Sequence, residues 1–217
     1  MPASGAKTMS FEGLSKRGAV TQGTRVLLST GAGLRMLPGL AENMFRDRAS
    51  QFHDRLGWDV HVDPRGWETD RYDRADTTYV IAVDAFGRHQ ASLRFLPTTG
   101  SHMLADVFGH LCGGAVPRGD TVWEATRFCL APRTTQWVVR KLLIGALGFG
   151  LAKGVTAATG VFDVRMRRVY RSLGWEPTIL GEENGIAAGR WSVSTGALEH
   201  LHHTERSRLS RSSINRR

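Results

Sequence analysis

TTYVIAVDAFGRHQASLRFL, residues 77–96, consists of two runs of strand-forming residues on either side of a short polar segment. Val, Ile, Tyr, Thr and Phe favour strands, and the Phe86-Gly87 pair between the runs is typical of a turn. We therefore expect strands at 77–84 and 89–96 that form a hairpin. This hairpin is the starting point for the fold of the whole chain.

The segments outside the hairpin add further strands and then alternate strands with helices. Phe45, Ala49, Phe52 and Leu56 recur at helical spacing, which predicts a helix before the hairpin. In chain order we expect a strand at 24–29, a helix at 38–56, an ordered loop at 57–76, the hairpin, a short helix at 103–111, a strand at 121–130, a helix near 135–153, a strand near 155–161, a helix near 163–173, and strands near 176–180 and 187–194. This order predicts an α/β fold with a mixed, mostly antiparallel central sheet flanked by helices, and it resembles the N-acetyltransferase (GNAT-like) fold.

Composition places the chain among folded proteins of ordinary size. It has 217 residues, of which 41% are hydrophobic and 23% charged, so neither a disordered nor a membrane-spanning chain is indicated. Its longest apolar run, at 142–152, is shorter than the roughly 20 residues that cross a bilayer, and the N-terminus lacks the apolar run of a signal peptide. Cys112 and Cys129 form no CxxC motif. We expect a cytoplasmic protein with no membrane span and no metal site.

The net charge of +9 is distributed unevenly along the chain. Residues 1–24 carry +2 and residues 204–217 carry +4, which leaves +3 for the segment between them. Both ends lack apolar periodicity, so we expect a flexible extension at 1–23, one folded domain at 24–203 and a flexible basic tail at 204–217. Within the domain, segment 54–76 has seven acidic residues against four arginines, whereas segment 127–171 has nine basic residues against Asp163. One part therefore suits a cation and the other an anion.

Ten residues stand out by type and position. Arg48 lies on the apolar face of its helix, where an arginine needs an anionic partner. Glu124 and Arg127 are three apart on one strand, so regular geometry puts them on opposite faces and a bulge could bring them together. The full set is Arg48, Phe52, Trp58, Glu68, Asp70, Asp73, Arg94, Phe108, Glu124 and Arg127. Each residue alone is also compatible with a solvated acidic loop, a core aromatic or a structural ion pair.

Taken in order, these residues form a recognisable signature. RxxxF at 48–52, GWDV at 57–60, ExDxYD at 68–73, RFLPTTGSHML at 94–104 and WEATRF at 123–128 follow one another along the chain. This succession resembles the acyl-homoserine-lactone synthases, the autoinducer synthases of bacterial quorum sensing. The resemblance runs from about residue 25 to about residue 194 and is loose after residue 130.

The resemblance implies an acyltransferase that joins S-adenosylmethionine to an acyl chain carried on acyl carrier protein. The amine of S-adenosylmethionine attacks the acyl thioester, and its carboxylate then displaces the sulfonium, which closes the lactone and releases methylthioadenosine. S-adenosylmethionine is consumed, so no cofactor is implied.

The residue types fit this chemistry. Glu68, Asp70 and Asp73, with the aromatic faces of Phe52 and Trp58, suit a sulfonium cation. Arg48 is a candidate clamp for the substrate carboxylate. Glu124 is the candidate base for the attacking amine, and Arg94 and Arg127 are expected to hold carboxylates in place.

Two further sets rest on the same resemblance. The acyl chain is expected between the sheet and the later helices, against Phe108, Leu142, Ala146, Phe149 and Phe162. The apolar residues and glycines at 142–164 favour a medium or long chain. Family members that make 3-oxo products often have a threonine late in this region, whereas VFDV occupies 161–164, although Thr159 lies nearby, so we expect a chain that is unsubstituted or 3-hydroxylated. The carrier protein is acidic, and its expected docking residues are Arg140, Lys141, Lys153, Arg165, Arg167, Arg168 and Arg171.

Two other functions are possible. A general N-acetyltransferase with an acyl-CoA donor has a glycine-containing phosphate loop after the corresponding strand, whereas PRTTQWVVRK at 132–141 has no glycine. A nucleic-acid-binding module would use the RMRRVYR segment at 165–171, but no recognised nucleic-acid motif accompanies it. The EHLHH segment at 199–203 suits a solvated helix end better than a metal site.

Overall fold

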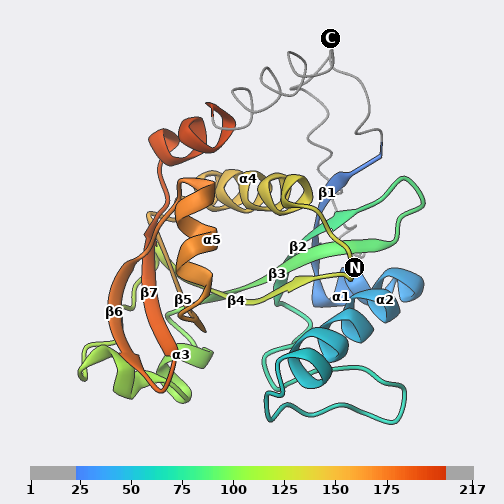
Figure 1. Ribbon diagram of the computed structural model, residues 1–217, viewed down its shortest axis with the longest axis horizontal. Coiled ribbons are helices and arrows are strands. Elements are labelled where there is room, and N and C mark those ends of the chain that lie inside the picture. The colour runs from blue at the N-terminus through green and yellow to red at the C-terminus, as the bar shows by residue number, and fades with distance from the viewer. Residues whose placement is uncertain (1–22, 204–217) are drawn as a thin grey trace, which may run out of the picture. The chain divides into compact units, whose positions relative to one another are not determined.

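The computed structural model describes residues 23–203 (Figure 1). The predicted flexible extension at 1–23, apart from Gly23, and the predicted basic tail at 204–217 lie outside the described residues. No helix within residues 23–203 is long and apolar enough to cross a membrane. A cytoplasmic location stays a prediction.

The strands form a seven-stranded mixed sheet in the order β1-β2-β3-β4-β5-β7-β6. Their bounds are β1 Arg25–Thr30, β2 Thr78–Val83, β3 His89–Pro97, β4 Val122–Leu130, β5 Ala157–Asp163, β6 Thr178–Glu183 and β7 Ile186–Ser192. The β4–β5 pair is parallel, and the β1–β2, β2–β3, β5–β7 and β6–β7 pairs are antiparallel. The predicted fold class is therefore confirmed.

The predicted helices are present with differences in their interruptions, and a short helix at 31–35 was not predicted. Their bounds are α1 Gly31–Arg35, α2 Pro38–Ala49, the π-helix η1 Ser50–Arg55, α3 Met103–Asp106, the 3-10 helix η2 Gly109–Cys112, α4 Gln136–Ala152 and α5 Met166–Leu173, and residues 195–203 are also helical. The helix expected at 38–56 thus changes from α to π geometry at Ser50, and the helix expected at 103–111 is two short pieces. Phe45, Ala49, Phe52 and Leu56 continue at steps of three and four residues through Ser50, so their periodicity gave no sign of the change.

The chain divides into two compact units, each built from two separate segments. Unit 1 comprises residues up to Phe95 together with Arg127–Leu142, and unit 2 comprises Leu96–Thr126 together with the residues from Leu143 onward. β3, β4 and α4 each contribute residues to both units. No single point along the sequence separates the two units, so the prediction of one domain at 24–203 is neither confirmed nor contradicted.

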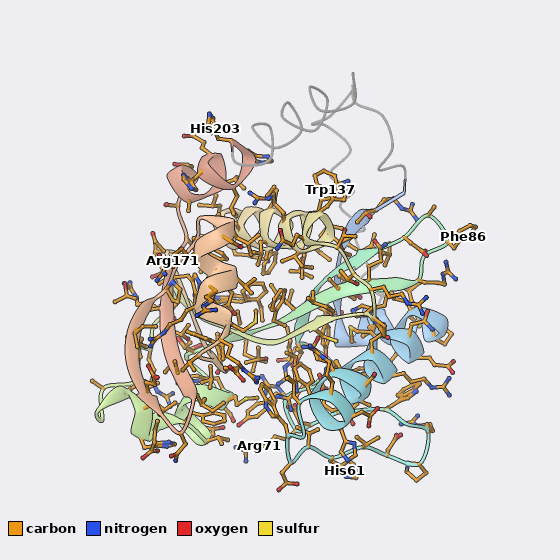
Figure 2. All side chains as sticks on the ribbon, in the orientation of Figure 1. His61, Arg71, Phe86, Trp137, Arg171 and His203 are labelled. Carbon is orange, nitrogen blue, oxygen red and sulfur yellow. The ribbon has the colours of Figure 1, made fainter. Side chains whose placement is uncertain are left out.

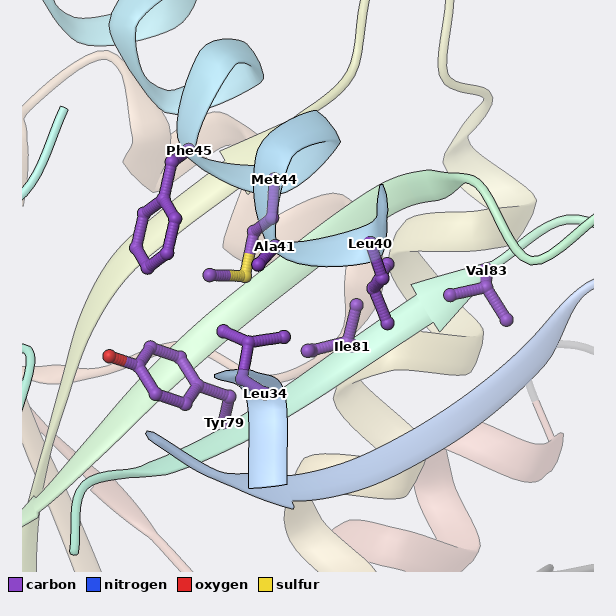
Figure 3. Close-up of a cluster of buried hydrophobic side chains, with 8 residues drawn as sticks. All are labelled: Leu34, Leu40, Ala41, Met44, Phe45, Tyr79, Ile81 and Val83. Carbon is purple, nitrogen blue, oxygen red and sulfur yellow. The ribbon is translucent and has the colours of Figure 1, made fainter. Parts of the chain in front are cut away.

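The core of unit 1 lies between α2 and the strand β2. Leu40, Ala41, Met44 and Phe45 of α2 pack on Tyr79, Ile81 and Val83 of β2, with Leu34 of α1 beside them (Figure 3). Alternate residues of β2 therefore face α2, as the period of a strand requires. The Phe86 side chain lies at the tip of the hairpin and projects away from it (Figure 2).

In unit 2 the two faces of the sheet are covered differently. Trp191 of β7 and Phe162 of β5 pack edge-on against each other and against Tyr170 of α5, with ring centroids 5.1–5.4 Å apart. On the opposite face, Leu104 and Leu111 pack against Ala188. β6 and β7 form the curved hairpin at one edge of this unit (Figure 1).

Candidate active site

Six of the ten predicted site residues form a closed ring of ion pairs in unit 1. Acidic and basic side chains alternate around it, and each one contacts both of its neighbours. The order is Arg48, Glu68, Arg127, Asp70, Arg94, Asp73 and back to Arg48. With three charges of each sign, the ring is neutral as a whole.

Arg48 uses all three guanidinium nitrogens in this ring. Its Nε lies 2.6 Å from Glu68 Oε2, and its two Nη atoms each lie 2.9 Å from an oxygen of Asp73. Its side chain is 1% exposed. The prediction of an anionic partner for Arg48 is correct, but in the structure that partner is supplied by carboxylates of the same chain.

Arg94 and Arg127 close the rest of the ring. Arg94 bonds Asp70 with both Nη atoms and lies 3.0 Å from Asp73. Arg127 Nη2 lies 2.8 Å from Glu68 and 2.8 Å from Asp70. The side chains of Asp70 and Arg127 are 20% and 10% exposed, whereas the other four are at most 6% exposed. The Asp70–Arg127 pair is therefore the accessible edge of the ring.

Burial and the ion pairs have opposite effects on these groups. Burial alone would raise the pKa of Asp73, but the Arg48 and Arg94 guanidinium groups outweigh it and hold that pKa well below its usual range. The pKa of Asp70 is likewise lowered by Arg94 and Arg127 against the effect of burial. For Arg48, burial lowers the pKa, but the carboxylates of Asp73 and Glu68 raise it by more than burial lowers it. The pKa of Arg48 is therefore shifted upward. All three groups are ionised at neutral pH.

Local backbone structure explains how the acids reach the ring. The loop 57–76 is ordered as predicted, and the Glu68 N–H donates to the carbonyl of Phe45, which ties the loop to α2. The Asp70 N–H donates to Asp73 Oδ2, and the Tyr72 N–H donates to Asp70 Oδ1. Asp and Asn side chains favour such turns because they bond nearby backbone groups. The turn therefore presents two carboxylates, three residues apart, that both contact Arg94.

Arg127 has an unusual backbone conformation within β4. Its φ is +51°, one of three positive φ values at non-glycine residues in the described part of the chain. Such a conformation costs about 1–3 kcal/mol and persists where the surroundings over-determine it. Regular strand geometry was the reason to expect Arg127 on the face opposite Glu124, and β4 is not regular at this residue. The irregularity accompanies the turn of the guanidinium toward Glu68 and Asp70.

Aromatic rings lie next to the ring of ion pairs. Phe52 and Trp58 stack with centroids 5.2 Å apart and planes at 15°. The Arg127 guanidinium carbon lies 5.5 Å from the centroid of Phe52. Phe52 and Arg48 lie one helical turn apart, so α2 and η1 together present an arginine and an aromatic ring to the acids.

Tyr79 was missed by the sequence reasoning. Its Oη donates to Asp73 Oδ1 at 2.7 Å, and burial together with the Asp73 carboxylate raises its pKa, so the phenol stays protonated. Tyr79 is paired with Arg94 across β2 and β3, so both side chains lie on the same face of the sheet. The hairpin register would have pointed to Tyr79 once Arg94 was singled out.

Glu124 belongs to unit 2 and is fully buried. Its Oε2 accepts the Met103 N–H at 2.7 Å and its Oε1 accepts the Leu104 N–H at 2.6 Å, so the carboxylate holds the first turn of α3. In the parallel pairing of β4 and β5, Glu124 lies opposite Thr159, whose buried Oγ1 has no hydrogen-bond partner among the described residues. Neighbouring residues of paired strands share a face, so this face of unit 2 carries a carboxylate and an unsatisfied hydroxyl.

The predicted acyl-pocket residues do not share one wall of unit 2. Phe108 packs with the Leu104 cluster on the α3 face. Phe149 packs edge-on against Trp123, and Phe162 belongs to the aromatic group of α5. Trp123 and Glu124 are neighbours along β4, so the Trp123 side chain lies on the face of the sheet opposite to that of Glu124. Leu142 and Ala146 are buried in α4.

The predicted docking residues also differ in their surroundings. Arg140 is 4% exposed, so its guanidinium does not lie at the surface, and Lys141 lies over the Trp137 ring and donates to the Thr24 carbonyl. The remaining residues are in unit 2. Arg165, Arg167 and Arg171 pair with Asp163, Glu182 and Glu176, and Arg171 is marked in Figure 2. Segment 127–171 is nearly free of acids in sequence, but the fold supplies acids from β6 and the preceding loop.

Two of the predicted docking residues in unit 2 have no ion-pair partner within residues 23–203. Lys153 and Arg168 are exposed and form no ion pair among the described residues.

A separate hollow of about 460 Å³ lies in unit 1 between α2, the β2–β3 turn and the segment after β4, and no predicted site residue lines it. Within the described chain no group of three or more His, Cys, Asp or Glu side chains could hold a metal ion.

Comparison with known proteins identifies the family to which the chain is similar. The family model described as autoinducer synthase matches residues 34–205. An acyl-homoserine-lactone synthase from Rhizobium etli is 41% identical over 164 residues, which cover 70% of this chain and 77% of that protein.

Solved structures give the same result. The CoA-dependent acyl-homoserine lactone synthase MesI has a TM-score of 0.73 at 27% identity and covers 82% of this chain and 94% of its own. TofI, in a ternary complex with an inhibitor and MTA, has a TM-score of 0.70 at 30% identity, with coverages of 82% and 96%. An acyl-CoA N-acyltransferase from Pseudomonas aeruginosa, at 15% identity and a TM-score of 0.51, covers 79% of this chain and 99% of its own and shares the fold alone.

Proposed function

This chain belongs to the autoinducer synthase family and is an acyl-homoserine-lactone synthase, and from this premise we propose that it joins S-adenosylmethionine to an acyl chain delivered by acyl carrier protein. The products are an N-acyl-homoserine lactone, methylthioadenosine and the free carrier. The observation that carries the proposal is the neutral ring of ion pairs with one accessible edge.

The accessible edge suits the amino-acid part of S-adenosylmethionine. That part carries an ammonium and a carboxylate, and the Asp70–Arg127 pair offers one charge of each sign with side-chain atoms 2.8 Å apart. A zwitterion that binds here replaces the Asp70–Arg127 ion pair by two pairs, one between its ammonium and Asp70 and one between its carboxylate and Arg127. Such charge-assisted hydrogen bonds are stronger than those between neutral groups. The stacked Phe52 and Trp58 rings offer their faces to the sulfonium cation.

This arrangement changes the proposed role of Arg48. Its nitrogens already bond Glu68 and Asp73 at 2.6–2.9 Å, and its side chain is buried. We therefore assign the clamp on the substrate carboxylate to Arg127, and Arg48 and Arg94 hold the acids that surround it. Glu68 and Asp73 then act mainly as partners of the arginines, and Asp70 is the acid left to meet the substrate.

Glu124 remains the proposed base for the attacking amine. The Glu124 carboxyl group accepts the backbone N–H groups of Met103 and Leu104, which fix its position and orientation in unit 2. The free amine attacks the thioester carbon, and the thiolate of the carrier leaves. The substrate carboxylate then attacks the carbon bonded to sulfur, and neutral methylthioadenosine leaves with the electron pair of that bond. This second step is intramolecular, so positioning the carboxylate supplies much of the advantage.

The donor is the finer part of the proposal. The ten residues after β4 and Ala131 contain no glycine, which argues against the phosphate loop of CoA-dependent acetyltransferases. MesI is described as CoA-dependent, so an acyl-CoA donor is the second candidate. For the acyl chain we propose a medium or long tail that is unsubstituted or 3-hydroxylated, against the apolar side chains of unit 2.

Two donors with the same acyl chain provide the test. Purified protein is incubated with S-adenosylmethionine and either octanoyl-carrier protein or octanoyl-CoA, and lactone and methylthioadenosine are quantified by mass spectrometry. We expect a higher kcat/KM with the carrier protein. A higher value with octanoyl-CoA replaces the donor, and the absence of lactone with both, across several chain lengths, overturns the proposed substrates.

A further inference from the structure

Gln51 makes two hydrogen bonds to the backbone of β4 from the first turn of η1. Its Nε2 donates to the Phe128 carbonyl at 2.8 Å, and its Oε1 accepts the Leu130 N–H at 2.8 Å. The residue is buried. A primary amide that bonds a carbonyl and an N–H two residues apart imitates the backbone of a neighbouring strand.

The bonded groups lie on the edge of β4 that faces away from β3. The next residue, Ala131, donates its N–H to the carbonyl of Gln90 at the start of β3. Backbone groups of successive strand residues point to opposite edges, so Leu130 and Phe128 face the other way. β4 pairs with β5 along this edge at Val122–Glu124, whereas at 128–130 the side chain of Gln51 supplies the partner.

This contact begins one residue after the irregular Arg127. The positive φ of Arg127 needs its flanking backbone to be held, and Gln51 fixes the segment that follows directly. Gln51 is also the residue before Phe52 and the third after Arg48, so the same helix that supplies the arginine and the ring to the site anchors the strand that carries Arg127. Arg127 in turn bonds Glu68 and Asp70 at 2.8 Å.

We propose that Gln51 is a positioning residue that holds Arg127 in its binding geometry and thereby sets the affinity for the zwitterionic end of S-adenosylmethionine. This inference rests on the proposed function. Gln51 has no part in the chemistry itself, so its loss weakens binding of S-adenosylmethionine in the ground state and the transition state alike. Such a loss raises KM and leaves kcat nearly unchanged.

The test compares Gln51→Leu with the wild-type enzyme in steady-state kinetics. Leucine has a similar volume but bonds neither backbone group. We expect KM for S-adenosylmethionine to rise about tenfold, with kcat and KM for the acyl donor within about twofold of wild type. If Gln51→Leu does not fold, Gln51→Asn gives the same comparison, because it keeps the amide but is too short to reach both groups.

A double variant shows whether the effect passes through Arg127. In the Arg127→Lys background, adding Gln51→Leu should change KM for S-adenosylmethionine less than twofold, whereas independent sites give additive effects. Thr134→Val is the matched control, because it removes another side-chain bond to backbone, from Thr134 Oγ1 to the Gln90 carbonyl at 2.8 Å, and should leave KM unchanged. An unchanged KM in Gln51→Leu, or full additivity with Arg127→Lys, overturns the inference. A wild-type enzyme that makes no lactone from S-adenosylmethionine overturns the proposed function instead.

Discussion

The two units of the molecule hold their functional groups by different means. In unit 1, six ionised side chains fix one another in a ring in which every carboxylate contacts two arginines. In unit 2, the buried carboxylate of Glu124 is fixed by backbone N–H groups, in a sheet whose packing is largely aromatic and aliphatic. In the proposed mechanism, the charges that meet the charged substrate are held by other charges, whereas the group that takes up a proton is held by the backbone.

The difference has an energetic consequence. A buried ion pair pays heavily for desolvation, and replacing the whole set by apolar residues can leave stability unchanged. Removing one member is different, because its partners then remain buried without compensation. The ring is therefore better explained by the geometry it imposes than by net stability, and unit 2 should respond to changes of volume more than to changes of charge.

The largest expected effect is on turnover, at the buried carboxylate of unit 2. Glu124→Gln should lower kcat by roughly 10²–10⁴-fold, because a general base contributes about that much. Both oxygens of Glu124 accept a backbone N–H, whereas the NH2 group of glutamine cannot accept one. A thermal melt must therefore accompany the kinetics to confirm that the variant folds. Near-normal turnover at neutral pH would remove Glu124 from the role of base and leave it as the anchor of α3.

The second expected effect is on stability, in the ring of unit 1. Arg48→Ala leaves Glu68 and Asp73 without their buried partner and should lower the free energy of unfolding by about 3–5 kcal/mol. Arg171→Ala in unit 2 removes an exposed pair with Glu176 and should cost about 0–1 kcal/mol. Urea denaturation of both variants measures the contrast. Equal losses would contradict the view that burial gives the ring its importance.

The sequence predicted the members of the ring but not their pairing. Arg48 lies 20 residues from Glu68 and 25 from Asp73, and the intervening loop has no period from which its path could be derived. The positive φ of Arg127 is likewise invisible in WEATRF, because nothing in the residue types marks an irregular strand. The succession of elements along the chain and most of their bounds followed from alternation and turn residues, which are local signals.

The docking set shows a different limit of sequence reasoning. Arg140 lies three residues before Leu143 and seven before Leu147, both buried, so helical spacing already placed it on an inward face. The partners of Arg167 and Arg171 come from residues that follow α5 in the chain. A count of charge along a segment takes no account of strands that return beside it.

The third prediction tests the response of unit 2 to volume. A Cβ at Gly160 would lie 2.7 Å from the carbonyl oxygen of Ala125, a backbone atom with little room to move. Gly160→Ala should therefore destabilise the protein by about 1–3 kcal/mol through overpacking. Gly148→Ala is the matched control, because nothing lies within 4 Å of its Cβ position and alanine favours the helix by about 0.5–1 kcal/mol. Opposite signs in denaturation midpoints are expected, and a loss of stability in both would contradict the prediction.

The fourth prediction concerns pH and belongs to the ring. Folding lowers the pKa values of Asp70 and Asp73 below 3.8, so their contribution to stability is complete above about pH 4 and is lost as pH falls further. Each of the two carboxylates adds up to about 1.4 kcal/mol per pH unit to the slope. The free energy of unfolding should be flat with respect to these groups from pH 5 to 7 and fall below pH 4. Asp70→Asn should have a shallower acid limb, and an identical limb would exclude Asp70 as a contributor.

The smallest expected effect is on the encounter with the donor, at the exposed charges of unit 2. Lys153 and Arg168 are the exposed members of the predicted docking set without an ion pair among the described residues, so an acidic carrier can reach them without displacing a partner. The double change Lys153→Glu and Arg168→Glu should raise KM for the acyl carrier protein roughly threefold to tenfold, because exposed interface charges act mainly on association. Raising the salt concentration should reproduce the effect in the wild type, since exposed charges are screened over about 8–10 Å. An uncharged acyl-pantetheine donor serves as the control and should show no change in KM. If KM for the carrier does not move, the carrier meets another part of the chain, and the proposed contribution of unit 2 is reduced to its shape and the buried carboxylate of Glu124.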